Sequence, residues 1–216
     1  MKKFIMITPL QPVSKDENGK VINDRLIPSF YQAQGNSKLA LGRETRFPII
    51  PVINGYVEEG EEFEVIAVTP ATESCAIHLE QLREEVASLS EQKKLVCKGV
   101  QEIPITYAGD VDTQIEIFRK LLDVLEDHDT LYGCLTFGDK PMTIALLMGM
   151  QYAYSVLSDV KIECVVYGQK DHASTQGDSL IFDITALIQL DEIVRKMANL
   201  KMKDPGSFLT RIIENR

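Results

Sequence analysis

The sequence predicts an α/β domain with a Rossmann-like, mainly parallel sheet, helices on both faces, and a hairpin or flap inserted near the amino terminus. Short apolar runs that suit buried strands alternate along the chain with longer segments of helical periodicity. Turn residues separate these segments, and one turn-rich stretch, 12–47, interrupts the alternation. The length of 216 residues is enough for one domain with a sizeable core.

The amino-terminal half contains the less regular elements. Lys3–Thr8 is an apolar run that fits a buried first strand. Residues 12–47 contain Asn18-Gly19, Pro12 and Pro28, which favour an inserted hairpin or flap. Arg43 and Arg46 suggest that it covers a ligand. The next elements are a helix starting at Pro48, a strand at Glu64–Val68 and a helix at Thr72–Leu89 with a stripe of Ile77, Leu82, Val86 and Leu89.

The carboxyl-terminal half alternates more regularly. Strands are predicted at Glu102–Tyr107, Leu131–Thr136, Lys161–Tyr167 and Leu180–Ile184. Helices are predicted at Asp112–Leu125, with Ile115, Ile117, Phe118, Leu121, Leu122 and Leu125 facing inward, at Met142–Leu157 and at Thr185–Asn199. We therefore expect one α/β domain over 1–200, followed at 201–216 by a tail or the start of a linker.

Composition and charge exclude several classes of protein. The 23 basic and 32 acidic residues give a net charge of -9, which argues against a partner such as long nucleic acid. We expect no signal peptide and no membrane-spanning segment. The four cysteines show no CxxC spacing, and two of them fall in expected strands, so reduced thiols and a cytoplasmic location are expected.

The motifs of common nucleotide-binding and hydrolytic enzymes are missing. The chain contains no GxGxxG, no GxxxxGK[ST] and no GxSxG. His78, His128 and His172 have no metal-ligand spacing, so we assign them solvated or structural roles. We expect neither a cofactor nor a metal.

Polar residues gather instead in loops that follow four of the expected strands. The carboxyl ends of parallel strands meet at one edge of a sheet, so these loops should converge on one site. Each residue also has a simpler role: Thr72 and Ser74 suit helix caps, and Gly138 suits a turn. Lys140 opposes the dipole of the helix that it begins, a placement that a bound anion would compensate. The candidate ligand-binding residues are Thr8, Gln11, Thr69, Thr72, Glu73, Ser74, Thr136, Phe137, Gly138, Lys140, Tyr167 and Gln169.

From Asp123 to Leu200, the chain resembles the CRISPR-associated Rossmann fold (CARF) family, in the branch with an Asp-x-Thr-His-Gly-x-Arg motif. The corresponding turn is Cys134-Leu-Thr-Phe-Gly-Asp-Lys140. Two further segments are similar to the family's Tyr-Tyr-Gly strand and Asp-Leu-Thr helix start: Lys161-Ile-Glu-Cys-Val-Val-Tyr-Gly168 and Ser179-Leu-Ile-Phe-Asp-Ile-Thr-Ala-Leu187. The amino-terminal half is similar only in general pattern and length.

The turn departs from the family motif at three positions. Cys134 stands where the family has aspartate, and Phe137 stands where it has histidine. Thr136 and Gly138 are kept, while Lys140 replaces arginine and loses the bidentate fork of a guanidinium. Roles that rest on the missing aspartate or histidine therefore do not transfer.

The resemblance implies a homodimer that binds a cyclic oligoadenylate, such as the tetra- or hexa-adenylate, in one composite pocket. A sensor of type III CRISPR antiviral defence that controls an effector domain, fused or separate, is the first expectation. A ring nuclease that slowly cleaves the messenger by metal-independent attack of a 2′-hydroxyl is the alternative, with Lys140, Thr136 and Ser74 as its catalytic residues. The third expectation, outside this family, is a Rossmann-like enzyme or scaffold that binds another nucleotide. Either the protein ends near residue 216 or the natural chain continues into an effector.

Overall fold

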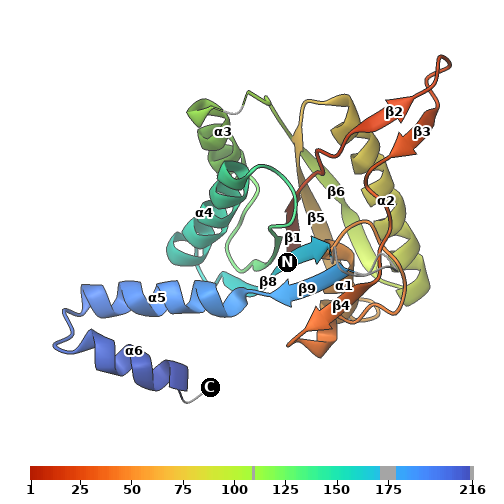
Figure 1. Ribbon diagram of the computed structural model, residues 1–216. Helices are drawn as coiled ribbons and strands as arrows, with labels where there is room; N and C mark the ends of the chain where they lie inside the picture. The colour runs from red at the N-terminus through yellow and green to blue at the C-terminus, as the bar shows by residue number, and fades with distance from the viewer. Residues whose placement is uncertain (109, 171–178, 215–216) are drawn as a thin grey trace. The chain divides into compact units, whose positions relative to one another are not determined.

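A computed structural model describes residues 1–108, 110–170 and 179–214 of the chain. A seven-stranded sheet with the order β4-β9-β8-β7-β1-β5-β6 lies within residues 1–183 (Figure 1). Its strands are parallel except for the pair β8 and β9, which confirms the predicted Rossmann-like, mainly parallel sheet. The strands are β1 (Lys2–Ile7), β4 (Tyr31–Gln34), β5 (Glu62–Pro70), β6 (Val96–Ile105), β7 (Thr130–Cys134), β8 (Lys161–Lys170) and β9 (Ser179–Asp183).

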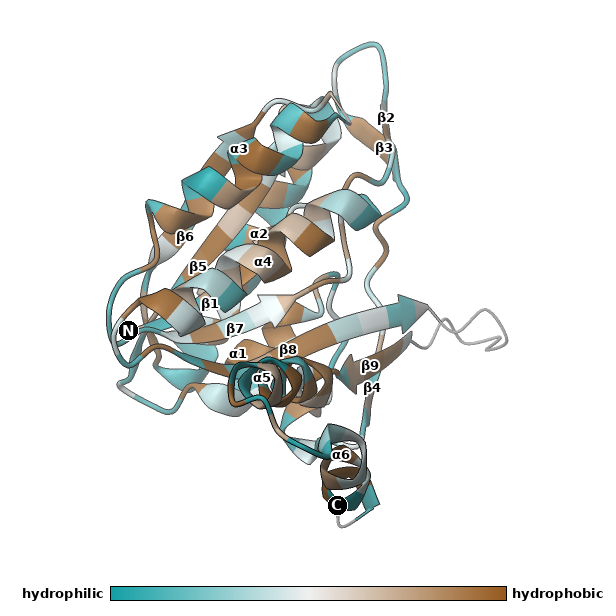
Figure 2. Cartoon of the chain, turned by 90° about the vertical axis from the view of Figure 1, so that its left-hand side faces the viewer, coloured by the Kyte–Doolittle hydropathy of each residue, from teal (hydrophilic) through white to brown (hydrophobic). Residues whose placement is uncertain are grey.

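Helices cover both faces of this sheet, as the apolar strands require. Helices α1 (Ile49–Tyr56) and α2 (Glu73–Lys93) lie on one face, and α3 (Val111–Leu122) and α4 (Lys140–Val156) lie on the other (Figure 1). Figure 2 views the molecule from the side of α3 and α4, where brown apolar residues alternate with teal polar ones along both helices. The central strand β1 is therefore buried from Lys3 to Ile7.

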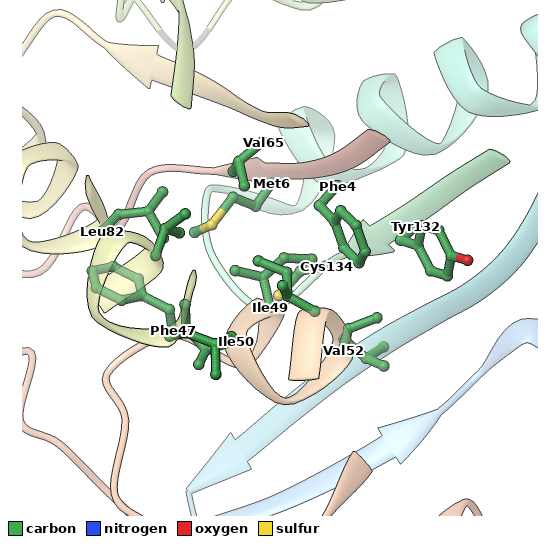
Figure 3. Packing of buried hydrophobic residues seen from close by; sticks show 14 of the residues in the cluster. Phe4, Met6, Phe47, Ile49, Ile50, Val52, Val65, Leu82, Tyr132 and Cys134 are labelled. Carbon is green, nitrogen blue, oxygen red and sulfur yellow. The ribbon is translucent and has the colours of Figure 1, made fainter. Parts of the chain in front are cut away.

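The main core lies between the sheet and the two helices that cover one of its faces, α1 and α2. Helix α1 is short and apolar, and its residues Ile49, Ile50, Val52 and Ile53 have no solvent exposure. Figure 3 shows Ile49, Ile50 and Val52 among the other residues of this core. Across the adjacent strands β1 and β7, the rings of Phe4 and Tyr132 stack with their centroids 4.4 Å apart. Burial of this large apolar surface is the main stabilising contribution to the domain.

The predicted insertion at 12–47 is only partly a projecting hairpin. Strands β2 (Val13–Lys15) and β3 (Val21–Asp24) form the expected antiparallel hairpin. The following residues pack on the domain instead: β4 becomes an edge strand parallel to β9, and a 3-10 turn, η1 (Ser37–Leu39), buries Leu39. Because turn residues outnumber these few buried apolar residues, the composition of residues 12–47 predicts a longer flap than the structure has.

Two further predictions need correction on the other elements. Strand β6 begins at Val96, earlier than expected, because its first residues lie on an edge strand and are mostly exposed, so they form no apolar run. On α3, Ile117 and Leu121 are buried as predicted, but Ile115 is 52% exposed. The remaining predicted helices and strands are present with shifted ends.

Residues 184–216 form a second compact unit, which begins directly after β9. Its helices are α5 (Thr185–Asn199) and α6 (Pro205–Glu214). On α5, Arg195 pairs with Asp191 one turn earlier at 2.8 Å, an interaction that supports an exposed helix. Among the described residues, none of the helices has the length and apolar character needed to cross a lipid bilayer.

Candidate functional site

The order of the strands reverses beside β1. Strands β5 and β6, which follow the 12–47 insertion, lie next to β1 toward one edge of the sheet, and the later strands β7 and β8 lie next to β1 toward the other edge. Ligands of open α/β sheets bind outside the carboxyl ends of the strands at such a reversal. The loops 8–12 and 135–139, which follow β1 and β7, therefore define the candidate site.

A cavity of about 270 Å³ lies between these two loops; we call it the strand-end cavity. Among the predicted ligand-binding residues, four line it: Gln11, Thr136, Phe137 and Gly138. Leu10 and Asp139 complete the lining. The structure thus brings the first and third of the predicted loops together at the point where the strand order reverses.

A second cavity of about 270 Å³ adjoins the first and shares Gln11, Thr136 and Phe137 with it; we call it the insertion cavity. Its other walls come from the 12–47 insertion and from β8: Arg25, Leu26, Ile27, Ser29, Tyr31, Arg46 and Gly168. Of the two arginines suggested by the sequence, Arg46 lines this cavity, while Arg43 lines neither. Arg25 and Tyr31 were missed, because no local pattern shows that β4 and the hairpin lie beside the motif turn.

The motif turn is held in place by the hydroxyl of Thr136. This oxygen accepts a hydrogen bond from the backbone N–H of Gly168 at 2.8 Å, and it accepts another from Cys134 Sγ at 3.2 Å. Burial raises the pKa of the Cys134 thiol to about 11, so the thiol stays protonated near neutral pH. The turn is therefore fixed between β7 and β8, and Cys134 is a core thiol rather than a nucleophile.

Packing explains the two residues that follow. Gly138 has φ of 88°, and a Cβ added there would lie 2.8 Å from Ile7 Cδ1, so both the backbone conformation and the close contact require glycine. Phe137 is buried, and its ring packs edge-on against Phe47 with centroids 6.5 Å apart. Phe137 thus forms an apolar wall of both cavities and part of the core.

Lys140 is exposed at the first residue of α4 and lines neither cavity. The position before it, the N-cap of the helix, is Asp139, whose carboxylate accepts a hydrogen bond from Tyr107 Oη at 2.9 Å. A carboxylate at this place complements the helix dipole. The chain itself therefore supplies a negative charge beside Lys140, and the placement of this lysine does not require a bound anion.

The predicted loop after β5 has structural roles. Thr72 caps α2, because its Oγ1 accepts from the N–H of Cys75 at 3.2 Å, and Ser74 Oγ lies 3.4 Å from the same hydroxyl. Glu73 pairs with Lys15 of the hairpin at 2.6 Å. Thr8 and Thr69 are both buried, and their hydroxyls lie 2.9 Å apart.

The last predicted residues lie on β8. Tyr167 and Gln169 are exposed, and neither lines the strand-end cavity or the insertion cavity. Side chains alternate between the faces of a strand, so it is the intervening Gly168 that faces the insertion. A Cβ at Gly168 would lie 2.6 Å from Pro48 Cγ, which explains why glycine stands there.

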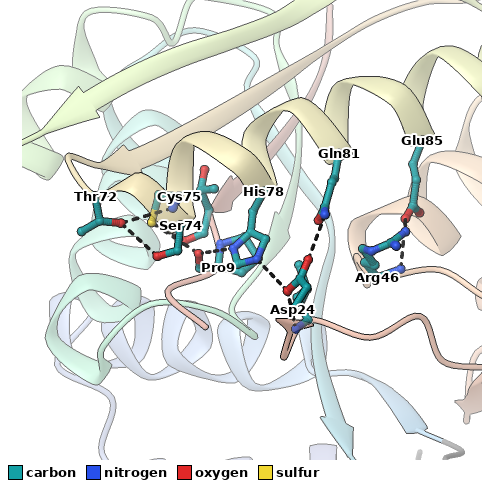
Figure 4. A network of polar contacts seen from close by, with 11 residues as sticks. Pro9, Asp24, Arg46, Thr72, Ser74, Cys75, His78, Gln81 and Glu85 are labelled. Carbon is teal, nitrogen blue, oxygen red and sulfur yellow. Dashed lines mark hydrogen bonds and ion pairs between the residues drawn. The ribbon is translucent and has the colours of Figure 1, made fainter. Parts of the chain in front are cut away.

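The described histidines have the roles expected for them. His78 is fully buried on α2: its Nδ1 lies 2.8 Å from the carbonyl oxygen of Pro9, and its Nε2 lies 3.1 Å from Asp24 Oδ1 (Figure 4). It therefore ties the hairpin to the loop after β1. The side chain of His128 is 72% exposed. His172 lies outside the described residues.

A scan of protein-family models finds no match to this chain, and a search of curated proteins finds no significant relative.

Proposed function

We propose that this chain is a sensor domain that binds a cyclic oligoadenylate at the strand-end cavity and controls an effector of type III CRISPR antiviral defence. The single observation that carries the proposal is the position of the Cys134–Lys140 turn. This turn, on which the resemblance to the CARF family rests, lies at the reversal of strand order and lines a cavity there together with Gln11. Backbone and amide groups at such an edge suit a nucleotide ligand.

An exposed apolar surface supports the proposal of a homodimer. Val111 and Ile115 of α3 and Ile144 and Met148 of α4 are each more than half exposed, and they border a cavity of about 250 Å³; we call these residues the α3–α4 face. Large exposed apolar patches mark interaction sites. Pro141 lines this cavity and follows closely on Asp139 of the strand-end cavity.

We propose that a second copy of the chain covers the α3–α4 face. A two-fold interface places the same surface of both copies together. Because this face adjoins the strand-end cavity, its pairing would set two such cavities side by side. The two-fold symmetric ligand would then occupy one composite pocket, and its binding would rearrange the dimer and so control the effector, whether fused or separate.

The contacts of the motif turn favour a sensor over a ring nuclease. Attack of a 2′-hydroxyl requires groups that stabilise developing charge at the phosphate. Of the residues considered for that role, Thr136 accepts two bonds within the fold, and Ser74 lies beside the helix cap. Lys140 lines neither cavity. Recovery of labelled cyclic tetra-adenylate intact after an hour with the protein is the outcome that agrees with a sensor.

Calorimetric titration with cyclic tetra- and hexa-adenylate tests the proposal. We expect one ring to bind per dimer with a Kd below about 10 μM. We expect Lys140→Ala to weaken binding severalfold, because Lys140 follows Asp139 of the strand-end cavity and its positive charge attracts the anionic ring without contacting it. Lys161→Ala is the matched control, because Lys161 is also exposed but begins β8 at the opposite end of the sheet. Absence of binding by either ring contradicts the proposal.

A further inference from the structure

Two residues that line the insertion cavity each have a buried polar atom with no hydrogen-bond partner among the described residues. The atoms are Nε of Arg46, which is a donor, and Oε1 of Gln11, which is an acceptor. Buried polar groups in native proteins are nearly always hydrogen-bonded, because an unmade bond leaves the full cost of desolvation. An orphaned donor and an orphaned acceptor on residues that line one cavity suit a ligand that offers both an acceptor and a donor, which the two side chains can reach by a change of rotamer.

Glu85, a residue of α2, positions Arg46. Glu85 holds the segment by accepting hydrogen bonds from the backbone N–H of Arg46 at 3.3 Å and from the hydroxyl of Thr45. Figure 4 shows Glu85 on α2 with Arg46 beside it. The carboxylate of Glu85 lies 3.4 Å from Nη1 of Arg46, so the guanidinium is oriented by one long contact, while Nε has no partner in the described part of the chain. The arginine is thus pre-positioned, and its planar donor edge can bind an anionic oxygen.

Arg25 brings a second positive charge to the same cavity. It follows Asp24, which is fixed by His78 and by Gln81 Nε2 at 2.9 Å, so the end of the hairpin is anchored while the Arg25 side chain is exposed. Its guanidinium makes no bond with any described residue. Two arginines against one paired carboxylate leave the cavity with an excess of positive charge, which suits an anion.

The remaining walls are apolar or neutral. Leu26 and Phe137 are buried, and burial raises the pKa of Tyr31 well above its ordinary value, so its phenol stays neutral. A cavity of about 270 Å³ lies just below the usual range of about 300–1,000 Å³ for small-molecule sites. It is therefore too small for a ring of four or six nucleotides, and one nucleotide unit is the largest part of such a ring that suits it.

We propose that the insertion cavity is a subsite for one nucleotide unit of the ligand, with its phosphate bound by Arg46 and Arg25. The base lies against the apolar wall and donates a hydrogen bond from its amino group to Gln11 Oε1. A nucleotide offers both the acceptor and the donor that the orphaned atoms lack. This subsite rests on the proposed function for its ring-shaped ligand, but its chemistry can be tested alone with a mononucleotide.

The test compares 5′-AMP with adenosine on the full chain by ligand-observed NMR titration. We expect AMP to bind at least about tenfold more tightly than adenosine, because a charge-assisted contact to phosphate is lost in the nucleoside. Arg46→Gln and Arg25→Gln should each weaken AMP binding by about tenfold and leave adenosine binding within about twofold. Arg43→Gln is the matched control from the same insertion.

Thermal unfolding of each variant separates folding from binding. Arg46→Gln loses the contact with Glu85, whereas Arg25→Gln loses no contact with a described residue. If Arg46→Gln proves unstable, the binding result for Arg25→Gln decides the test. Equal binding of AMP and adenosine, or equal effects of Arg25→Gln and Arg43→Gln, would overturn the subsite. Cyclic ligands that bind normally to both arginine variants would overturn the subsite alone. AMP binding that depends on the arginines without any binding of cyclic rings would overturn the proposed function alone.

Discussion

Gly138 follows the motif strand with φ of 88°, and the space where a Cβ would lie is occupied by Ile7 of β1. The sequence indicates a turn glycine at this position, but it does not show the second reason, because Ile7 is distant in the chain. The N-cap at Thr72 was predictable, since capping depends on neighbouring residues alone. Arg46 and Gln11 meet only through the tertiary fold, so their shared cavity could not be predicted.

Replacement of Gly138 by alanine tests the two requirements together. We expect Gly138→Ala to lower the free energy of unfolding by about 2–4 kcal/mol, because the left-handed backbone and the overpacking against Ile7 both oppose a side chain. Urea denaturation measures the change. Gly35→Ala is the control: it has φ of 79° but open space around the added Cβ, so about 1–2 kcal/mol is expected. Equal losses would show that the contact with Ile7 contributes nothing.

At the scale of elements, amphipathic periodicity predicted the helices well and the edge strands poorly. The buried strands β1 and β7 are continuous apolar runs, which the sequence displays directly. Strand β4 alternates between half-buried and exposed residues within a turn-rich segment, and only its pairing with β9 makes it a strand. On α3, periodicity marked Ile115 as inward-facing, because the helical spacing of apolar residues does not distinguish an exposed apolar residue from one in the core.

A substitution on the α3–α4 face tests the proposed homodimer. Ile144→Glu should convert the proposed homodimer into a monomer, because an unpaired carboxylate in an apolar interface is costly to desolvate. Size-exclusion chromatography with light scattering gives the mass. Ile22→Glu on the hairpin is the matched control, since Ile22 is 65% exposed and Ile144 is 58% exposed. A dimer that survives Ile144→Glu, or a wild-type monomer at micromolar concentration, would contradict this interface.

For the whole molecule, the alternation of strands and helices was sufficient to predict the fold class. The alternation could not predict the order of the strands beyond β8. There β9 pairs antiparallel with β8, and β4 pairs with β9 at the edge of the sheet. The position of the strand-end cavity followed from the general rule for parallel sheets. The insertion cavity did not, because it depends on how a single irregular segment packs.

Global stability should fall at alkaline pH. The pKa of Cys134 rises from 9.0 in the unfolded chain to about 11 in the native one because of burial, and burial also raises the pKa of Tyr56 to about 12. Between the two values of each group, the unfolded chain loses a proton that the native chain keeps, so rising pH favours unfolding. We expect Cys134 alone to lower the free energy of unfolding by up to about 3 kcal/mol as pH rises from 9 to 11.

Urea denaturation at pH 7.5, 9 and 10 measures this decline. Cys134→Ala removes the ionisable thiol, so its stability should depend less steeply on pH above 9 than that of the wild type. The tyrosines remain in the variant and leave a smaller decline. Identical pH profiles for the two proteins would show that Cys134 ionises as freely in the native state as in the unfolded chain.

The edge formed by β4 and β9 also has a consequence for the order of folding. Asn36, just after β4, binds the carboxylate of Asp183 at the end of β9, 147 positions away along the chain. Pairings of such long range are slow to form, because the closure of a large loop precedes any gain from the contact. During synthesis, residues 31–34 must wait for residues 179–183 to leave the ribosome. Tyr31 therefore reaches its place beside Gly168 late, and the wall of the insertion cavity is among the last parts of the domain to assemble.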